Sequence, residues 1–149
     1  MIQTQTRPTS AFEVKRSWHH VDAKGKILGR LAGEIALLLM GKKKGYFVRN
    51  LDCGDYVVVT NASGVKVTGR KEDLKVYYRH SMYPGGFRAE SFKELKARRP
   101  EEIIIHAVKG MLPQNKLRAS MLKRLMVFPG DENKFADKFN KEGSSPTRG

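Results

Sequence analysis

The segment from Val76 to Gly86 reads VYYRHSMYPGG and concentrates residue types that could contact a nucleic acid. Its three tyrosines offer ring faces on which unpaired bases can stack, and Arg79 offers a planar guanidinium for phosphate. The Pro-Gly-Gly turn lets a ligand approach the backbone closely. A solvated tyrosine-rich loop without a ligand would have the same composition. The residues of this segment that we predict to contact RNA are Tyr78, Arg79, His80, Tyr83, Gly85 and Gly86.

Basic residues gather in further segments. Three consecutive lysines follow the expected end of a helix at Gly41, where one or two cations would satisfy the helix dipole, so three beside Arg49 indicate phosphate contact. Five cations and no acid lie between Lys109 and Arg124, whereas a merely solvated helix face would mix the two signs. The basic residues predicted to bind RNA, in addition to Arg79, are Lys42, Lys43, Lys44, Arg49, Arg70, Lys71, Lys109, Lys116, Arg118, Lys123 and Arg124.

The overall charge agrees with a polyanionic partner. The 149 residues hold 29 Lys and Arg against 15 Asp and Glu, a formal charge of +14. Residues 131–149 are balanced, with four basic and four acidic side chains, so the excess belongs to residues 1–130. The positive charge is therefore expected on a folded body rather than on a cationic tail.

Residues that could support catalysis are few. The segment Gly25–Gly29 matches a phosphate-binding glycine loop poorly. Asp52 and Asp55 are the only candidate metal ligands near the expected sheet edge, and turn or cap formation explains their spacing as well. His80 has no evident partner, and Cys53, the only cysteine, fits a small residue at a strand entry. We therefore expect no catalytic site, no metal, no cofactor and no small-molecule substrate.

Two other functions remain open on the residues alone. An enzyme that modifies or cleaves RNA would use Asp52, Asp55 and His80, and its activity would require a divalent metal. A protein that compacts DNA would bind any duplex equally well.

The apolar pattern predicts strands that alternate with helices, and hence an α/β fold in one domain. The continuous apolar run 56–60 is typical of a central parallel strand covered on both faces. Other strands are expected at 18–23, 65–68 and 126–128, the second of them half exposed. Helices are expected at 29–40, 92–99, 101–111 and 115–125.

The chain divides into three segments by composition. We expect a flexible N-terminal extension at 1–17, an RNA-binding domain at 18–130 and a charge-balanced, flexible tail at 131–149, with disorder at 143–149. No apolar run is long enough for a membrane span, and a single cysteine suits a reducing compartment. An organellar presequence is the alternative interpretation of residues 1–17.

Five segments in order resemble one family. They are DAKGKILGRLAGEIA at 22–36, GDYVVVTNA at 54–62, VTGRK at 67–71, VYYRHSMYPGG at 76–86 and AVKGMLPQNKL at 107–117. Together they resemble the bacterial type of large-subunit ribosomal protein L-thirteen over about residues 18–130. The resemblance implies a three-layer α/β/α domain around a mainly parallel sheet and a structural protein that binds large-subunit ribosomal RNA during assembly. It also implies neighbouring ribosomal proteins as partners and a cytoplasmic ribosome, with an organellar ribosome as the alternative.

The chain departs from this family pattern in three places. Gly41–Gly45 reads GKKKG where the family usually has GKHKP, which keeps the charge and loses the proline. Leu117-Arg118-Ala119 replaces the common Leu-Gly-Arg, and residues 131–134 replace a His-rich segment. Contacts of the C-terminal segment are therefore the least transferable from the family.

Overall fold

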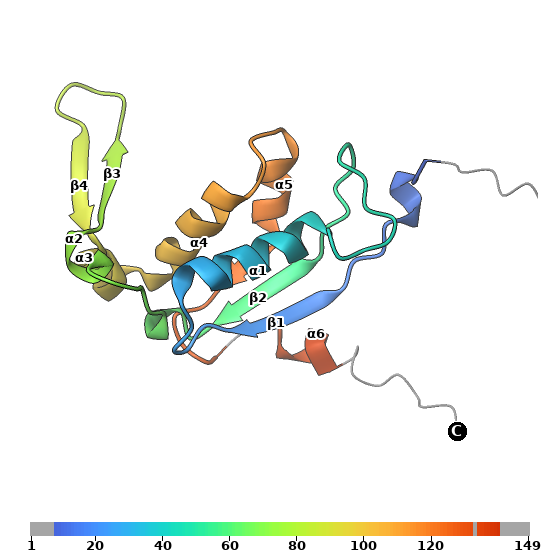
Figure 1. Cartoon of the computed structure of the whole chain (residues 1–149), viewed down its shortest axis with the longest axis horizontal. Coiled ribbons are helices and arrows are strands. Elements are labelled where there is room, and N and C mark those ends of the chain that lie inside the picture. The colour runs from blue at the N-terminus through green and yellow to red at the C-terminus, as the bar shows by residue number, and fades with distance from the viewer. Residues whose placement is uncertain (1–7, 133, 141–149) are drawn as a thin grey trace, which may run out of the picture.

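A parallel sheet of three strands lies at the centre of the protein, whose computed structural model describes residues 8–132 and 134–140. Strand β2 (Tyr56–Thr60) lies between β1 (Trp18–Asp22) and β5 (Leu125–Val127) (Figure 1). Val57, Val58 and Val59 are completely buried, because a central strand of a parallel sheet is covered on both faces. The predicted α/β class, the parallel sheet and its central strand are confirmed.

Helices α1 (Leu28–Met40) and α4 (Pro100–Met111) pack against each other and cover one face of the sheet. Leu31, Ile35 and Leu39 recur at helical spacing on α1 and are fully or almost fully buried. The helix ends at Gly41, whose φ of +74° is the left-handed conformation that glycine adopts without strain. These helices agree with the predicted ranges to within one residue.

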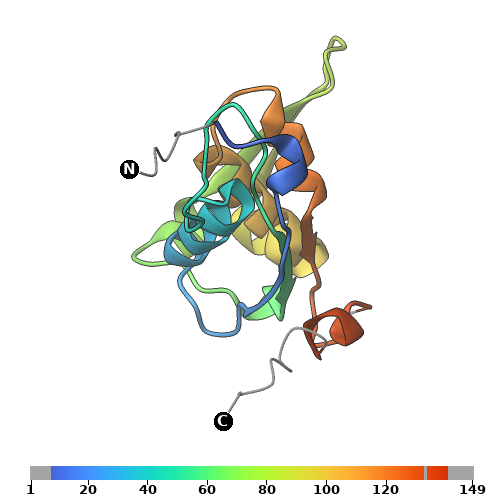
Figure 2. The ribbon, with the colours of Figure 1, turned by 90° about the vertical axis from the view of Figure 1, so that its right-hand side faces the viewer.

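The opposite face of the sheet carries an aromatic cluster. The Trp18 ring stacks on Tyr56 at a centroid distance of 4.4 Å and on Phe135 at 5.3 Å. Because Tyr56 and Val57 point to opposite faces of β2, Phe135 lies on the face away from the buried Val57. Helix α6 (Ala136–Asn140) follows Phe135 and contacts β1, which gives the predicted three layers with a thin second helical layer (Figure 2). The disorder predicted for 143–149 lies outside the described residues.

An antiparallel hairpin projects from the body of the protein (Figures 1 and 2). Strand β3 (Val76–His80) follows the short helix α2 (Lys71–Leu74), and β4 (Phe87–Ser91) leads into α3 (Phe92–Arg98). Ser91 caps α3 by accepting a hydrogen bond from the Glu94 backbone N–H, while Glu94 accepts one from the Ser91 N–H. The sequence predicted the Pro-Gly-Gly turn but not the two strands that it joins.

The remaining elements are short. The 3₁₀ helices η1 (Ala11–Glu13) and η2 (Ala62–Gly64) precede and follow the first two strands, and helix α5 (Leu117–Lys123) precedes β5. Helix α5 is shorter than the predicted 115–125, since Asn115 caps it from outside and Leu125 already belongs to β5. The predicted strand 65–68 is wrong: only Lys66 pairs, in a single bridge to Ile27.

Candidate nucleic-acid interface

The hairpin presents two chemically different faces. Pairing places Tyr78 opposite Ala89 and His80 opposite Phe87, so that Tyr78, His80 and Phe87 share one face. The Tyr78 and Phe87 rings are stacked at 5.7 Å with an interplanar angle of 22°, and their residues are 67% and 61% exposed. Two large rings stacked on each other in solvent leave their outer faces open, which is the type of surface on which unpaired bases stack.

On the other face of the hairpin, Arg79 lies directly opposite Arg88. Like charges at directly opposed positions of an antiparallel pair destabilise it. Neither guanidinium forms a hydrogen bond or an ion pair with a described residue. The pKa of Glu102 is lowered chiefly by its bond from Arg99 and to a smaller extent by the charge of Arg79, so the repulsion between Arg79 and Arg88 is only partly offset. An anion bound between the two side chains would offset the repulsion. Arg88 was not predicted from the sequence, because the tyrosine-rich segment was taken to end at Gly86.

The turn at the tip of the hairpin is held in one conformation by its own backbone. Gly86 N–H donates to the Tyr83 carbonyl at 2.9 Å, and Met82 N–H donates to His80 Nδ1 at 2.8 Å. Met82 and Tyr83 are 89% and 75% exposed. Beside this turn a pocket of about 380 Å³ is lined by Arg79, His80, Ser81, Gly85, Gly86 and Arg88. Four of these six residues were predicted from the sequence, and Ser81 and Arg88 were not.

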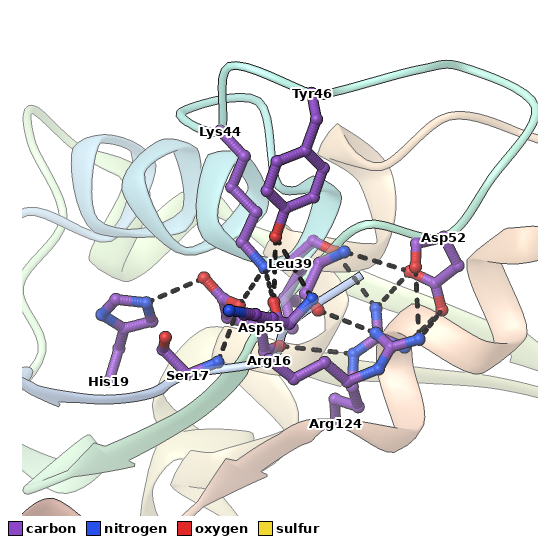
Figure 3. A network of polar contacts seen from close by, with 11 residues as sticks. Arg16, Ser17, His19, Leu39, Lys44, Tyr46, Asp52, Asp55 and Arg124 are labelled. Carbon is purple, nitrogen blue, oxygen red and sulfur yellow. Dashed lines mark hydrogen bonds and ion pairs between the residues drawn. The ribbon is translucent and has the colours of Figure 1, made fainter. Parts of the chain in front are cut away.

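The lysine segment that follows α1 divides into exposed and internal cations. Lys42, Lys43 and Arg49 are exposed. Lys44 turns inward instead: its ammonium donates to an Asp55 carboxylate oxygen and to the Lys15 carbonyl, each at 2.5 Å (Figure 3). Lys44 therefore ties the start of the 41–55 loop to its last residue, just before β2, and to the N-terminal segment. For this reason we remove it from the predicted RNA-binding set.

Asp55, the partner of Lys44, is held by several hydrogen bonds. It is 5% exposed and accepts hydrogen bonds from Lys44, from the Ser17 backbone N–H at 3.0 Å and from His19 Nε2 at 3.0 Å. Burial acts to raise the pKa of Asp55, but the bonds from Lys44, Ser17 and His19 outweigh it, so the pKa lies below its usual value. Its carboxylate is thus ionised and fully engaged.

Arg124 was predicted to be an RNA-binding cation on the surface, but it is buried. The residue is 7% exposed, and its guanidinium forms a two-pronged ion pair with Asp52. It also donates to the Leu39 carbonyl at 3.2 Å and to the Asp55 carbonyl at 3.3 Å (Figure 3). The backbone passes so close that Gly54 has no room for a Cβ. Arg124 therefore holds α1, β2 and α5 together and is not a surface cation.

Asp52 forms the predicted turn contact, accepting a hydrogen bond from the Gly54 backbone N–H at 3.4 Å, and both Asp52 and Asp55 also form ion pairs. Each carboxylate is held by cations, Asp52 by Arg124 and Arg16 and Asp55 by Lys44. In the described ranges, no group of three or more His, Cys, Asp or Glu side chains is placed to hold a metal ion. No helix in those ranges is long and apolar enough to cross a membrane.

The other predicted cations lie outside the hairpin. Lys109, Lys116, Lys123, Arg70 and Lys71 are exposed, and Arg118 is half-buried. Lys71 lines a pocket with Arg30 and Lys75, which the sequence analysis did not single out because they come from separate elements. RNA contact by these residues stays a prediction.

The fold and surface define a class of protein: a strongly basic α/β domain whose cations and aromatic rings are exposed, and whose buried carboxylates are paired with cations. Comparison with known proteins then gives the family. The model of the family described as ribosomal protein L13 matches residues 16–134. The chain belongs to this family of ribosomal proteins, which are structural components and not enzymes.

Curated relatives agree with this assignment. A large ribosomal subunit protein uL13 from Dehalococcoides mccartyi is 53% identical over 88% of this chain and 92% of its own length. Proteins of the same name from Symbiobacterium thermophilum and Dictyoglomus thermophilum are 50% and 53% identical, over 83% and 81% of this chain and 86% and 85% of their own. The family resemblance inferred from the sequence is confirmed, and the alternative of an RNA-cleaving enzyme is not supported.

Proposed function

We propose that the protein is a structural constituent of the large ribosomal subunit that binds large-subunit ribosomal RNA and supports assembly of the subunit. The observation that carries this proposal is the projecting hairpin, which opposes Arg79 to Arg88 on one face and exposes the Tyr78 and Phe87 rings on the other. One face suits phosphate and the other suits unpaired bases, and only a nucleic acid supplies both.

The mechanism is neutralisation of charge together with docking of a preformed shape. The exposed cations release counterions from RNA phosphates when they bind, while the hairpin and the rigid α/β body fix the orientation. The proposed contacts are the exposed members of the predicted set, with Arg88 and Phe87 added and Lys44 and Arg124 removed. The proposed partners also include neighbouring ribosomal proteins, and the proposed location is the cytoplasmic ribosome.

Binding of the purified chain to large-subunit ribosomal RNA tests the proposal, with random duplex RNA of equal length as the control. If on the order of 8 phosphates are contacted, the logarithm of affinity falls against the logarithm of salt with a slope of roughly −6 to −7. The chain is also expected to remain with large subunits through a high-salt wash. A slope near −1, or equal affinity for random duplex, contradicts the proposal.

The hairpin has its own test. Replacing Arg88 by Ala removes one of the two opposed cations without touching the core, because Arg88 is exposed. We expect weaker RNA binding, a slope reduced by about one, and a hairpin that is no less stable. The matched control is Arg88→Lys, which keeps a positive charge at the same position and is expected to leave the slope unchanged.

A further inference from the structure

A pocket of about 290 Å³ lies where the segment after α1 meets the linker between α4 and α5. It is separate in the sequence from the hairpin, and its walls come from four parts of the chain. The apolar part of its lining includes Met40, Phe47, Leu51 and Met121. Met121 is 3% exposed, so the floor of the pocket is part of the hydrophobic core and is firmly positioned.

The polar residues of this pocket have unused hydrogen-bonding capacity. Lys42, Arg49 and Asn115 line it, and all three are exposed. Neither cation has a hydrogen-bond or ion-pair partner for its side chain within residues 8–132 and 134–140, in contrast to the neighbouring Lys44. Asn115 uses its side-chain oxygen to accept from the Leu117 N–H at 3.1 Å, which caps α5. Its amide nitrogen is thereby left as a donor that no described residue engages.

This combination restricts what the pocket can bind. A free anion would use the two cations but would gain nothing from the apolar floor. An apolar side chain of another protein would use the floor but would leave two cations and an amide donor without partners. A metal ion would find no carboxylate among the lining residues. A nucleotide has an aromatic base, hydrogen-bond acceptors on the edge of the base and a phosphate on either side, and so it uses every group present.

We propose that this pocket binds one unstacked base of RNA. Phe47 supplies the ring against which the base stacks, the Asn115 amide nitrogen donates to an acceptor on the base edge, and Lys42 and Arg49 hold the flanking phosphates. The volume is about ten times the share of one water in the liquid, which is room for a planar base. The inference rests on the proposed RNA-binding function and adds a base-specific contact to the phosphate contacts.

Salt dependence separates base stacking from phosphate contact. Stacking releases no counterions, so loss of the Phe47 ring lowers the affinity for RNA by the same factor at every salt concentration. Phe47→Leu, which keeps the pocket apolar, is expected to weaken binding to large-subunit ribosomal RNA roughly 5-fold to 100-fold with an unchanged slope. Phe47→Tyr restores binding, since the ring is kept. Phe12→Leu is the matched control, because the Phe12 ring is 100% exposed and is not among the residues that line the pocket.

The outcomes of this experiment are distinct. Wild-type affinity in Phe47→Leu, or no rescue by Phe47→Tyr, overturns the base pocket. A reduced slope in Phe47→Leu also overturns it, because the ring would then be acting through the neighbouring cations. In each of these cases the wild-type chain can still bind ribosomal RNA with its full slope, so the proposed function stands or fails separately.

A second measurement does not depend on variants. The full chain labelled with ¹³C at its methionine methyl groups is mixed with a short single-stranded RNA, and in parallel with an abasic strand of equal length. We expect the Met40 and Met121 methyl resonances to shift with the RNA but not with the abasic strand, while Met126 on β5 stays in place. Equal shifts with both strands, or none with either, overturn the proposal. If subunit binding requires Phe47 but RNA never moves these methyl groups, the pocket holds a side chain of a neighbouring protein instead.

Discussion

Replacing Arg124 by Ala is the sharpest test of the distinction between internal and surface cations. The change removes the two-pronged partner of Asp52 and the donors to the Leu39 and Asp55 carbonyls. Asp52 keeps Arg16, at 3.8 Å, and the Gly54 backbone N–H, at 3.4 Å. Breaking a buried ion pair on one side costs about 3–5 kcal/mol, because the remaining charge stays in a poorly solvated place. For a chain of this size, that loss lowers the unfolding midpoint by about 10 °C or more.

Chemical denaturation measures the free energy of unfolding. RNA binding by the folded fraction, measured at several salt concentrations, gives the slope of log affinity against log salt concentration. Lys123→Ala is the matched control, because Lys123 precedes Arg124 and is exposed. We expect Lys123→Ala to change stability by less than about 0.5 kcal/mol and Arg124→Ala to leave the salt slope unchanged. The reasoning is refuted if Arg124→Ala is as stable as Lys123→Ala, or if it lowers the slope by about one as a surface cation would.

Four further outcomes are expected. Lys43→Ala should leave thermal stability unchanged and reduce the salt slope of RNA binding by about one. Val58→Ala should lower the free energy of unfolding by about 1–3 kcal/mol without changing that slope, since Val58 is completely buried. Because the pKa of Asp55 is lowered in the folded state, its stabilising effect is present above the unfolded pKa of about 3.9 and is lost as pH falls through the folded value, so the stability difference between wild type and Asp55→Asn should shrink in acid titrations. Tyr77→Phe should leave stability equal or raise it by about 1 kcal/mol in denaturant unfolding, because the buried Tyr77 hydroxyl has no hydrogen-bond partner among the described residues.

Local pattern determined most of the fold. The apolar run 56–60, the helical spacing of Leu31, Ile35 and Leu39, and Gly41 as a helix end are signals contained within a few residues, and the structure has each of them. The strand expected at 65–68 failed, because its alternating pattern is the same whether a neighbouring strand pairs with it along its length or at Lys66 alone.

The division of the cations between core and surface was decided only by tertiary structure. Lys43 and Lys44 are neighbours of the same type, yet Lys44 reaches Asp55 while Lys43 points into solvent. Arg124 contacts residues 69 to 85 positions away along the chain, a pairing that no local spacing encodes.

The same limit applies to the candidate site. The sequence by itself determined that this chain is a basic α/β protein with a tyrosine-rich segment, because charge and periodicity are properties of the residues in order. That Arg79 faces Arg88, and that Phe47 and Asn115 line one pocket, follows from strand register and from helix packing. Both depend on contacts between segments that are distant in sequence, and only the folded chain brings those segments together.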